Sequence, residues 1–532
     1  MKQMKQILSK NKKSLIPFLL FTILVSMLAV VAGYSLGWII DACEAEGNRV
    51  EVLFRNTAMT ISVWLVFLLA DVVREWWEAK QRIRLKNDLR GMATRKIASV
   101  EYSEFAAKDS GAYVSWLSND VDQLYTNSFE KLFRAVSGVC NAIFAFVVMS
   151  SGGWYIGATA LALFSLLVIT PKLFEKKLQE ATKNRSEALE KGLEAYKDTV
   201  MGAGIFYLNN LRQRIVERIE NTSMSTEQRV YRSNVEEIKV GGVLSIVNIL
   251  SQCAIIAAAT LATILGGCNI GLALSMGNLA GVFFNGVKNA TQSIISLRAS
   301  EPLWEKFQLN EKNDEAREVL DSIHHISMEN ISFAYDEKQI LENRSFSFEQ
   351  GGKYAILGES GSGKSTVLKL LMGLLPDYEG SIFYNDTEQK QSNLSSLYEQ
   401  VAYVDQQVYL FQDSLRFNIT LGADYSDEEV MSAVKACKLE SLLEALPHGL
   451  DSQIAENGKN LSGGQCQRIA LARGFIRKVH YILMDEGTSA LDEENALDIE
   501  ESLMEQKEMG VIIITHNLHD SVKRQLNRVY QL

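Results

Sequence analysis

The sequence predicts a membrane domain of six α-helical spans, followed by an α/β domain that carries a phosphate-binding loop. Three observations support this fold class. The first 290 of the 532 residues contain four long runs without a charged side chain. After residue 323 the chain changes to alternating or fully apolar segments that are typical of β-strands. One of these segments leads directly into GESGSGKST, which begins at Gly358 and is rich in glycine.

The four uncharged runs account for six spans, because a helix needs ~20 apolar residues to cross a bilayer. The runs are Leu15–Ile40, Asn56–Ala70, Ala135–Pro171 and Val240–Val287. The last two contain 37 and 48 residues, too many for one span each, and glycine-rich stretches interrupt them at 150–153 and 266–271. Each of these two runs therefore predicts a hairpin of two helices.

Basic residues predict that both ends of the chain are cytoplasmic. Five Lys and Arg lie in the first 14 residues, ten in Lys80–Arg134 and thirteen in Lys172–Lys239, against two in Asp41–Arg55. Because cytoplasmic connections carry an excess of Lys and Arg, the two long charged connections are expected inside. Their leucines and alanines recur at helical spacing, so the membrane helices are expected to continue into the cytosol.

Three polar residues are candidates for lining a substrate cavity. Asp71 lies near the inner end of the second span, and Asn285 and Lys288 lie in the sixth. An ionisable residue at membrane depth is a functional candidate by default. The alternatives stay open, because Asp71 also fits a helix end that has left the bilayer, and the polar sixth span also fits hydrogen bonds between helices.

Composition argues against several classes of function. The net charge is −10, so no nucleic-acid partner is expected. The six cysteines show no C-x-x-C spacing and indicate neither a zinc site nor a disulfide framework. The basic start MKQMKQILSKNKKSL leads into a long apolar run without a small-residue cleavage site, which indicates a membrane anchor.

The glycine-rich stretch fits G-x-x-x-x-G-K-[ST], the pattern of a nucleotide-binding P-loop. A strand-like segment precedes it and a helical segment follows it, as this loop requires. Its backbone N–H groups would surround the β-phosphate of ATP, while Lys364 would reach the β- and γ-oxygens and Ser365 would hold Mg²⁺. The predicted ATP-binding residues of the loop are Gly358, Ser360, Gly361, Gly363, Lys364, Ser365 and Thr366.

Two further apolar strands end in polar residues. VHYILMDEG delivers Asp485, which would bind Mg²⁺ through water, and Glu486, which would orient or polarise the attacking water. VIIITH delivers His516. Because the carboxyl ends of parallel strands meet at one edge of a sheet, these residues are expected beside the P-loop. The second half is therefore expected to be an α/β P-loop ATPase domain.

With these motifs, the chain resembles the ATP-binding cassette (ABC) transporters, as an exporter-type half-transporter with six spans and one nucleotide-binding domain. The resemblance covers nearly the whole chain. The signature LSGGQ consists of Leu461, Ser462, Gly463, Gly464 and Gln465; Gln406 lies in the Q-loop, Asp492 in the D-loop SALD, His516 is the switch histidine, and Tyr335 stands where an aromatic ring stacks on adenine. The resemblance implies that Gln406 and His516 act with Glu486 in catalysis. It also implies that Gln406 joins Ser365 and Asp485 around Mg²⁺.

The resemblance further implies how the chain works. Two nucleotide-binding domains would dimerise head to tail, so that the signature of one closes over the ATP on the P-loop of the other. A second half-transporter is therefore expected as the partner, in a homodimer or in a heterodimer with a related chain. ATP hydrolysis would drive export of a peptide or of an amphipathic or lipophilic small molecule by alternating access across the bacterial cytoplasmic membrane.

Three other functions are alternatives to ATP-driven export. An importer built on the exporter fold, for a metal chelate or a cofactor, is not excluded by any feature of the sequence. A soluble signature ATPase that acts on DNA or ribosomes lacks six spans. A membrane ATPase that only senses a ligand is a further alternative.

The sequence also suggests where the domains begin and end, and a few of its residues differ from those usual in the family. The expected domains are 1–306 for the membrane part, 307–322 for the linker and 323–532 for the nucleotide-binding part. The segments 110–125 and 197–210 resemble the regions of the two coupling helices. Asp405, Cys466 and Gly487 depart from the usual residues of the family, and none of them removes a catalytic group.

Overall fold

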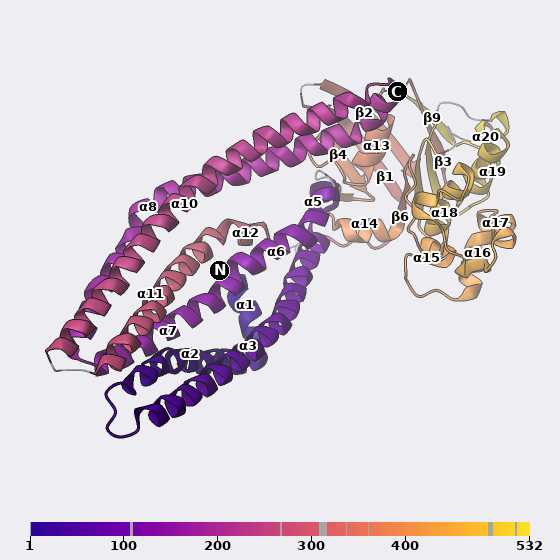
Figure 1. Cartoon of the computed structure of the whole chain (residues 1–532). Coiled ribbons are helices and arrows are strands. Elements are labelled where there is room, and N and C mark those ends of the chain that lie inside the picture. The colour runs from indigo at the N-terminus through magenta and orange to yellow at the C-terminus, as the bar shows by residue number, and fades with distance from the viewer. Residues whose placement is uncertain are drawn as a thin grey trace. The chain divides into compact units, whose positions relative to one another are not determined.

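The computed structural model describes residues 2–106, 110–265, 269–307, 317–336, 338–359, 361–487, 493–515 and 519–532 (Figure 1). The chain forms two compact units. One consists of Met1–Ser99 and Asp109–Leu309, and the other of Val100–Lys108 and Asn310–Leu532. A short piece of the first half of the sequence thus belongs to the unit formed by the second half.

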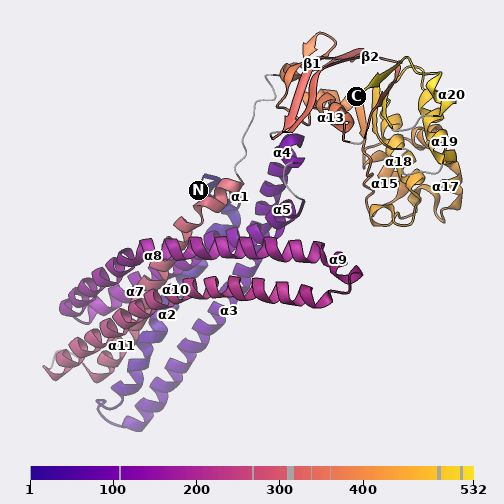
Figure 2. The same cartoon turned by 90° about the horizontal axis from the view of Figure 1, so that it is seen from above.

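The first unit is entirely helical. Its helices are α1 (Lys2–Lys10), α2 (Lys12–Asp41), α3 (Arg49–Ser99), α5 (Ser110–Ser115), α6 (Val121–Leu124), α7 (Lys131–Ser151), α8 (Trp154–Met201), α9 (Ala203–Leu208), α10 (Arg212–Ile264), α11 (Ile270–Ala299) and α12 (Glu301–Lys306). Two π-helical stretches, η1 (Trp116–Asp120) and η2 (Tyr125–Glu130), join α5, α6 and α7. Figure 2 shows α8 and α10 running side by side to the short α9 at their tip.

The helices agree with the predicted spans. In the described residues, five helices are long and apolar enough to cross a membrane, and Trp154–Leu167 of α8 is a shorter apolar stretch. The first predicted hairpin is confirmed, since α7 ends at Ser151 and α8 begins at Trp154. Gly153 between them has φ +149°, a conformation that favours glycine. The second hairpin joins α10 to α11, and part of its turn lies outside the described residues.

The long helical connections are also present, since α3, α8 and α10 contain 51, 48 and 53 residues. The segment that resembles the second coupling region contains α9. The segment that resembles the first, 110–125, contains α5, η1, α6 and the first residue of η2, and α4 (Tyr102–Ala106) precedes it. This α4 belongs to the second unit, where Arg317 forms an ion pair of 3.3 Å with Glu101.

Glycines let α11 approach two neighbouring helices closely. A Cβ atom on Gly138 of α7 would lie 2.6 Å from the carbonyl oxygen of Gly286 on α11, and the reverse distance is also 2.6 Å. A Cβ atom on Gly37 of α2 would lie 2.2 Å from the carbonyl oxygen of Gly271. Small residues at membrane helix interfaces permit such backbone contact. The positions of α2, α7 and α11 therefore depend on these glycines.

The second unit contains two sheets. Its strands are β1 (His325–Tyr335), β2 (Lys338–Glu349), β3 (Lys353–Leu357), β4 (Glu379–Tyr384), β5 (Thr387–Glu388), β6 (Val401–Val404), β7 (Tyr481–Asp485), β8 (Gly510–Ile514) and β9 (Arg528–Gln531). An antiparallel sheet has the order β2-β1-β4-β5, and a parallel sheet has the order β6-β7-β8-β3-β9. All residues of β7 and β8 are buried, which fits their unbroken apolar sequences.

Helices cover both faces of the parallel sheet. On one face, α13 (Lys364–Leu371) packs with the antiparallel sheet in a core that includes Val367 and Leu483. On the other face, α18 (Gly463–Ile476) packs in a core that includes Leu471 and Ile482, together with α15 (Leu415–Thr420) and α16 (Asp427–Ala436). The remaining described helices of this unit are α14 (Leu394–Gln400), α17 (Glu440–Ala445), α19 (Glu493–Met504) and α20 (Asp520–Lys523).

The close glycine contact predicts a stability effect. Gly138→Ala places a methyl group against a backbone carbonyl of α11, so α7 and α11 must separate, and we expect unfolding to become easier by about 1–3 kcal/mol. The measurement is thermal unfolding of the purified protein in detergent. Gly241→Ala on α10 is the matched control, because a Cβ there meets no atom within 4 Å. Equal melting temperatures for the two variants would contradict the packing argument.

Candidate functional site

The predicted nucleotide residues gather at the carboxyl edge of the parallel sheet. The P-loop follows β3, Gln406 follows β6, and Asp485 and Glu486 lie at the end of β7. Because these strands run parallel, their ends lie at the same edge. These residues therefore lie at one edge of the sheet.

The P-loop is closed around its own lysine. Gly361 and Gly363 have φ values of +82° and +93°, in the left-handed region where glycine is favoured. Lys364 is 4% exposed, and its Nζ donates to the carbonyl oxygens of Gly358 (2.9 Å) and Glu359 (2.8 Å). The loop therefore places a buried cation and the N-terminus of α13 in one cradle, a combination that binds phosphate.

Asp485 forms the second part of the site. Its Oδ1 accepts a hydrogen bond of 2.8 Å from Ser365 Oγ, which links β7 to the start of α13. Burial raises the pKa of the Asp485 carboxyl, although the bond from Ser365 lowers it. A hydroxyl and a carboxylate are oxygen ligands of the kind that Mg²⁺ prefers. These residues therefore fit a magnesium ion.

Glu486 lies between two predicted partners. Its backbone has φ +47°, rare for a residue with a side chain, and its N–H donates to the carbonyl oxygen of Ile514 (3.0 Å). One carboxylate oxygen accepts from Gln406 Nε2 at 3.1 Å, and the other lies 4.0 Å from Lys364 Nζ. The strained backbone turns this carboxylate toward the P-loop, as strain at functional sites often does.

A residue not singled out from the sequence supports the Q-loop. Gln467 Nε2 on α18 donates to the backbone carbonyl oxygens of Gln406 (3.2 Å) and Asp405 (3.5 Å). The side-chain oxygen of Gln467 also limits the space at Gly487, where a Cβ atom would lie 3.1 Å from it and 2.1 Å from Met484 Cε. This crowding gives a physical reason for glycine at 487.

The signature residues form the N-terminus of α18. Ser462 Oγ accepts from the Gln465 N–H at 3.3 Å, and Gln465 Oε1 accepts from the Ser462 N–H at 2.9 Å, which is a capping box. Each bond uses an acceptor of the side chain. The hydroxyl hydrogen of Ser462 and the amide hydrogens of Gln465 can therefore still be donated to an anion. The backbone at Gly463 and Gly464 lies in the first turn of the same helix.

The signature and the P-loop do not meet within one chain. Their helices, α18 and α13, pack against opposite faces of the parallel sheet. In the part of the chain that the structure describes, no hydrogen bond or ion pair joins Leu461–Gln465 to the P-loop. Cys466, the next residue, is half-buried against Gly458, and burial raises the pKa of its thiol. It is thus kept as a poorly reactive thiol at neutral pH.

Five more predicted residues complete the nucleotide set. Tyr335 lies at the end of β1, is 44% exposed, and packs edge-to-face on Phe333 with ring centroids 4.9 Å apart. Thr366 is buried in the first turn of α13. Ser360, Asp492 and His516 lie outside the described residues.

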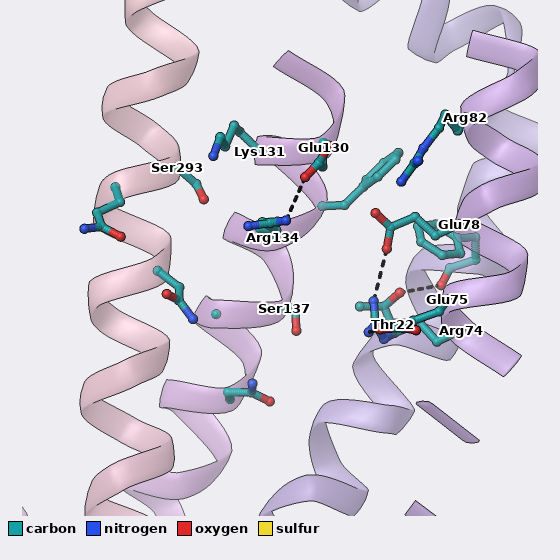
Figure 3. A pocket seen from close by; sticks show the side chains of 16 residues that line it. Thr22, Arg74, Glu75, Glu78, Arg82, Glu130, Lys131, Arg134, Ser137 and Ser293 are labelled. Atoms are coloured by element: carbon teal, nitrogen blue, oxygen red, sulfur yellow. Dashed lines mark hydrogen bonds and ion pairs between the residues drawn. The ribbon is translucent and has the colours of Figure 1, made fainter. Parts of the chain in front are cut away.

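A charged cavity of about 640 Å³ lies in the helical unit, among α2, α3, η2, α7 and α11 (Figure 3). The residues that line it are Phe18, Thr22, Arg74, Glu75, Glu78, Arg82, Glu130, Lys131, Phe133, Arg134, Ser137, Gly138, Asn141, Asn289, Gln292 and Ser293. Four are basic and three are acidic. Figure 3 shows two ion pairs, each between residues four positions apart. Arg74–Glu78 (3.1 Å) lies on α3, and Arg134–Glu130 (2.7 Å) lies where η2 continues into α7.

The three residues expected from the sequence to line a cavity are not among those that line this one. Asn285 accepts a hydrogen bond of 2.9 Å from Asn248, and Lys288 Nζ donates to Ser245 Oγ at 3.1 Å, so both bind α10. Asp71 forms an ion pair of 2.8 Å with Arg74 and so orients a residue that does line the cavity. Hydrogen bonding between helices, the alternative given for the sixth span, describes Asn285 and Lys288.

Comparison with known proteins agrees with this architecture. The family model described as "ABC transporter" matches residues 341–489, and the one described as "ABC transporter transmembrane region" matches residues 15–287. A probable ABC transporter ATP-binding/permease protein of Haemophilus influenzae is 30% identical and aligns with 79% of this chain and 78% of the relative. An ATP-dependent lipid A-core flippase of Pasteurella multocida is 28% identical, over 88% of this chain and 83% of the relative.

The fold has a solved counterpart. The ATP-bound structure of a bacterial Atm1-family ABC exporter superposes with a TM-score of 0.84 at 19% identity, covering 98% of this chain and 93% of that one. The P-loop and its carboxylates are therefore part of an ATPase that drives transport. The chain belongs to the ABC transporter family, as an exporter-type half-transporter with its membrane and nucleotide-binding domains in one polypeptide.

Proposed function

We propose that this chain moves an amphipathic lipid with an anionic head group out of the cytoplasmic leaflet, as a dimer of half-transporters in a bacterial cytoplasmic membrane with both termini inside. The observation that carries the proposal is the charged cavity among membrane-crossing helices of a chain that also has an ATP site. The flippase names of several relatives, at 27–31% identity, support a lipid cargo.

The proposed ATP site uses several side chains that are already in contact, such as Ser365 with Asp485 and Gln406 with Glu486. Lys364 exchanges the carbonyls of its own loop for phosphate oxygens, and Tyr335 stacks on the adenine. Ser365, Asp485 and Gln406 would hold Mg²⁺, which would neutralise charge on the β- and γ-phosphates. Glu486 orients the attacking water, helped by His516, and Gln406 holds the Glu486 carboxylate in place.

Closure requires a second copy or a related chain. Since the signature and the P-loop lie on opposite faces of one sheet, the γ-phosphate held by one chain is reached by the signature of another. The hydrogen-bond donors of Ser462 and Gln465 that the capping box does not use, together with the N-terminus of α18, complete that site. Asp492 of the D-loop follows Glu486 closely in the sequence and would contribute to the junction of the two domains.

The cavity suits a charged head group attached to an apolar tail. Lys131 has no carboxylate within 4.0 Å among the described residues, while Arg82 lies over the Tyr125 ring at 5.6 Å. These two cations are available to a phosphate on the cargo, because Arg74 and Arg134 are already paired with glutamates. Phe18 and Phe133 supply apolar lining beside them.

Glu486→Gln should leave ATP binding unchanged and lower steady ATP hydrolysis at least 100-fold, because the amide keeps the shape and removes the base. The measurement is Mg²⁺-dependent phosphate release from protein in lipid nanodiscs. Glu444→Gln, an exposed glutamate of α17, serves as the control and should hydrolyse ATP at the parent rate. Unchanged turnover in Glu486→Gln would remove this residue from the mechanism.

A mixed dimer tests the shared site. With Lys364→Ala in one copy and Ser462→Arg in the other, both changes fall in the same composite site, and the second site stays whole. With both changes in one copy, each composite site carries one defect. We expect clear ATP hydrolysis from the first arrangement and very little from the second, after purification through two different affinity tags. Equal activity in the two arrangements would argue against sharing between chains.

Lys131→Gln should weaken binding of lipid A about tenfold, because a charge-assisted hydrogen bond to phosphate is lost. Tryptophan fluorescence can report binding, since the Trp77 ring lies 6.2 Å from the ring of the cavity residue Phe18. Lys183→Gln, an exposed lysine of α8 outside the cavity, is the control. A parent protein that does not bind lipid A would redirect the search to other amphiphiles, and equal affinities would exclude Lys131 from the binding site.

A further inference from the structure

Tyr403 contacts the nucleotide site, although it lies outside the motifs predicted from the sequence. It lies on β6, three residues before Gln406, and its hydroxyl donates a hydrogen bond of 3.1 Å to Asp485 Oδ2. The other oxygen of the same carboxylate accepts from Ser365. Both oxygens of Asp485 are thus held by hydroxyl donors, one from the P-loop helix and one from the neighbouring strand.

The strand register brings the two residues together. Tyr403 pairs with Leu483 in the parallel ladder between β6 and β7. Side chains alternate along a strand, so Leu483 and Asp485 point to the same face, and Tyr403 points to that face as well. Its long side chain therefore reaches the strand end diagonally. A phenylalanine would fit the same position and would lack only the donor.

The environment keeps the tyrosine a donor. Tyr403 is half-buried against the core that includes Leu483, and burial raises the pKa of its hydroxyl further above the ordinary value. The nearby Asp485 and Asp405 act in the same direction, because a second negative charge beside them is disfavoured.

We propose that Tyr403 is a positioning residue for the Mg²⁺ of MgATP: it fixes Asp485 through Oδ2, so that Oδ1 stays directed at Ser365 and at the metal site. This inference rests on the Mg²⁺ binding proposed above. Residues that hold a metal-binding carboxylate from behind commonly change metal affinity 10- to 100-fold when they are replaced. Losing this hydroxyl leaves Asp485 free to rotate about its side chain.

The test compares ATP affinity with and without magnesium. Full-length Glu486→Gln protein in nanodiscs, which does not turn over ATP, is titrated calorimetrically with ATP in Mg²⁺ and again in EDTA. The ratio of the two dissociation constants measures the contribution of the metal. Adding Tyr403→Phe should reduce this ratio on the order of tenfold, through weaker binding in Mg²⁺ and unchanged binding in EDTA. Hydrolysis plays no part in the readout.

Tyr398→Phe is the matched control. Tyr398 lies on α14 near the same strand, and its hydroxyl makes no hydrogen bond within the described residues, so the ratio should equal that of the parent. An unchanged ratio in Tyr403→Phe would overturn the proposal. So would an equal loss of affinity in Mg²⁺ and in EDTA, which marks a purely structural residue. If the Glu486→Gln parent itself shows no dependence on Mg²⁺, the proposed metal site fails, which is a separate result.

Discussion

The parallel pairing of β7 with β6 and β8 is the constraint on which the nucleotide site depends. This pairing is set by buried apolar residues, yet it decides where Asp485 and Glu486 end relative to Gln406 and the P-loop. A shift of register by one residue would turn each carboxylate to the opposite face. The geometry of the site therefore depends on the packing of the two cores that hold the sheet in place.

In the membrane half, close backbone contact at glycines adds to the packing of apolar side chains. Gly138 and Gly286 bring α7 and α11 together, and the cavity lies beside that contact, with Gly138 in its wall. Of the four basic residues that line the cavity, Arg74 and Arg134 are paired with glutamates. An ion pair offsets part of the cost of holding charges away from water.

Local sequence patterns predicted much of this structure, but they did not predict contacts between residues that are far apart in the sequence. The P-loop, the carboxylates after β7 and the hairpin at Gly153 are each encoded within a few neighbouring residues. Which side of a helix faces a given neighbour was harder to predict. Asn285 and Lys288 bind α10, because the rotation of α11 about its own axis depends on glycine contacts with α7 and α2. The bond from Tyr403 to Asp485 spans 82 positions and depends on strand register, so composition and spacing gave no sign of it.

The docking of α4 has a consequence for how the chain is made. Glu101 and Tyr102–Ala106 belong to the unit that contains the nucleotide site, but Arg317, the ion-pair partner of Glu101, lies more than 200 residues later. At a synthesis rate of about 5–20 residues per second, this delay amounts to roughly 10–40 seconds. During that time α3 has already left the ribosome, before Arg317 has been made. Slow codons or a chaperone acting between the end of α3 and β1 would therefore affect the yield of folded protein more than the same intervention after β6.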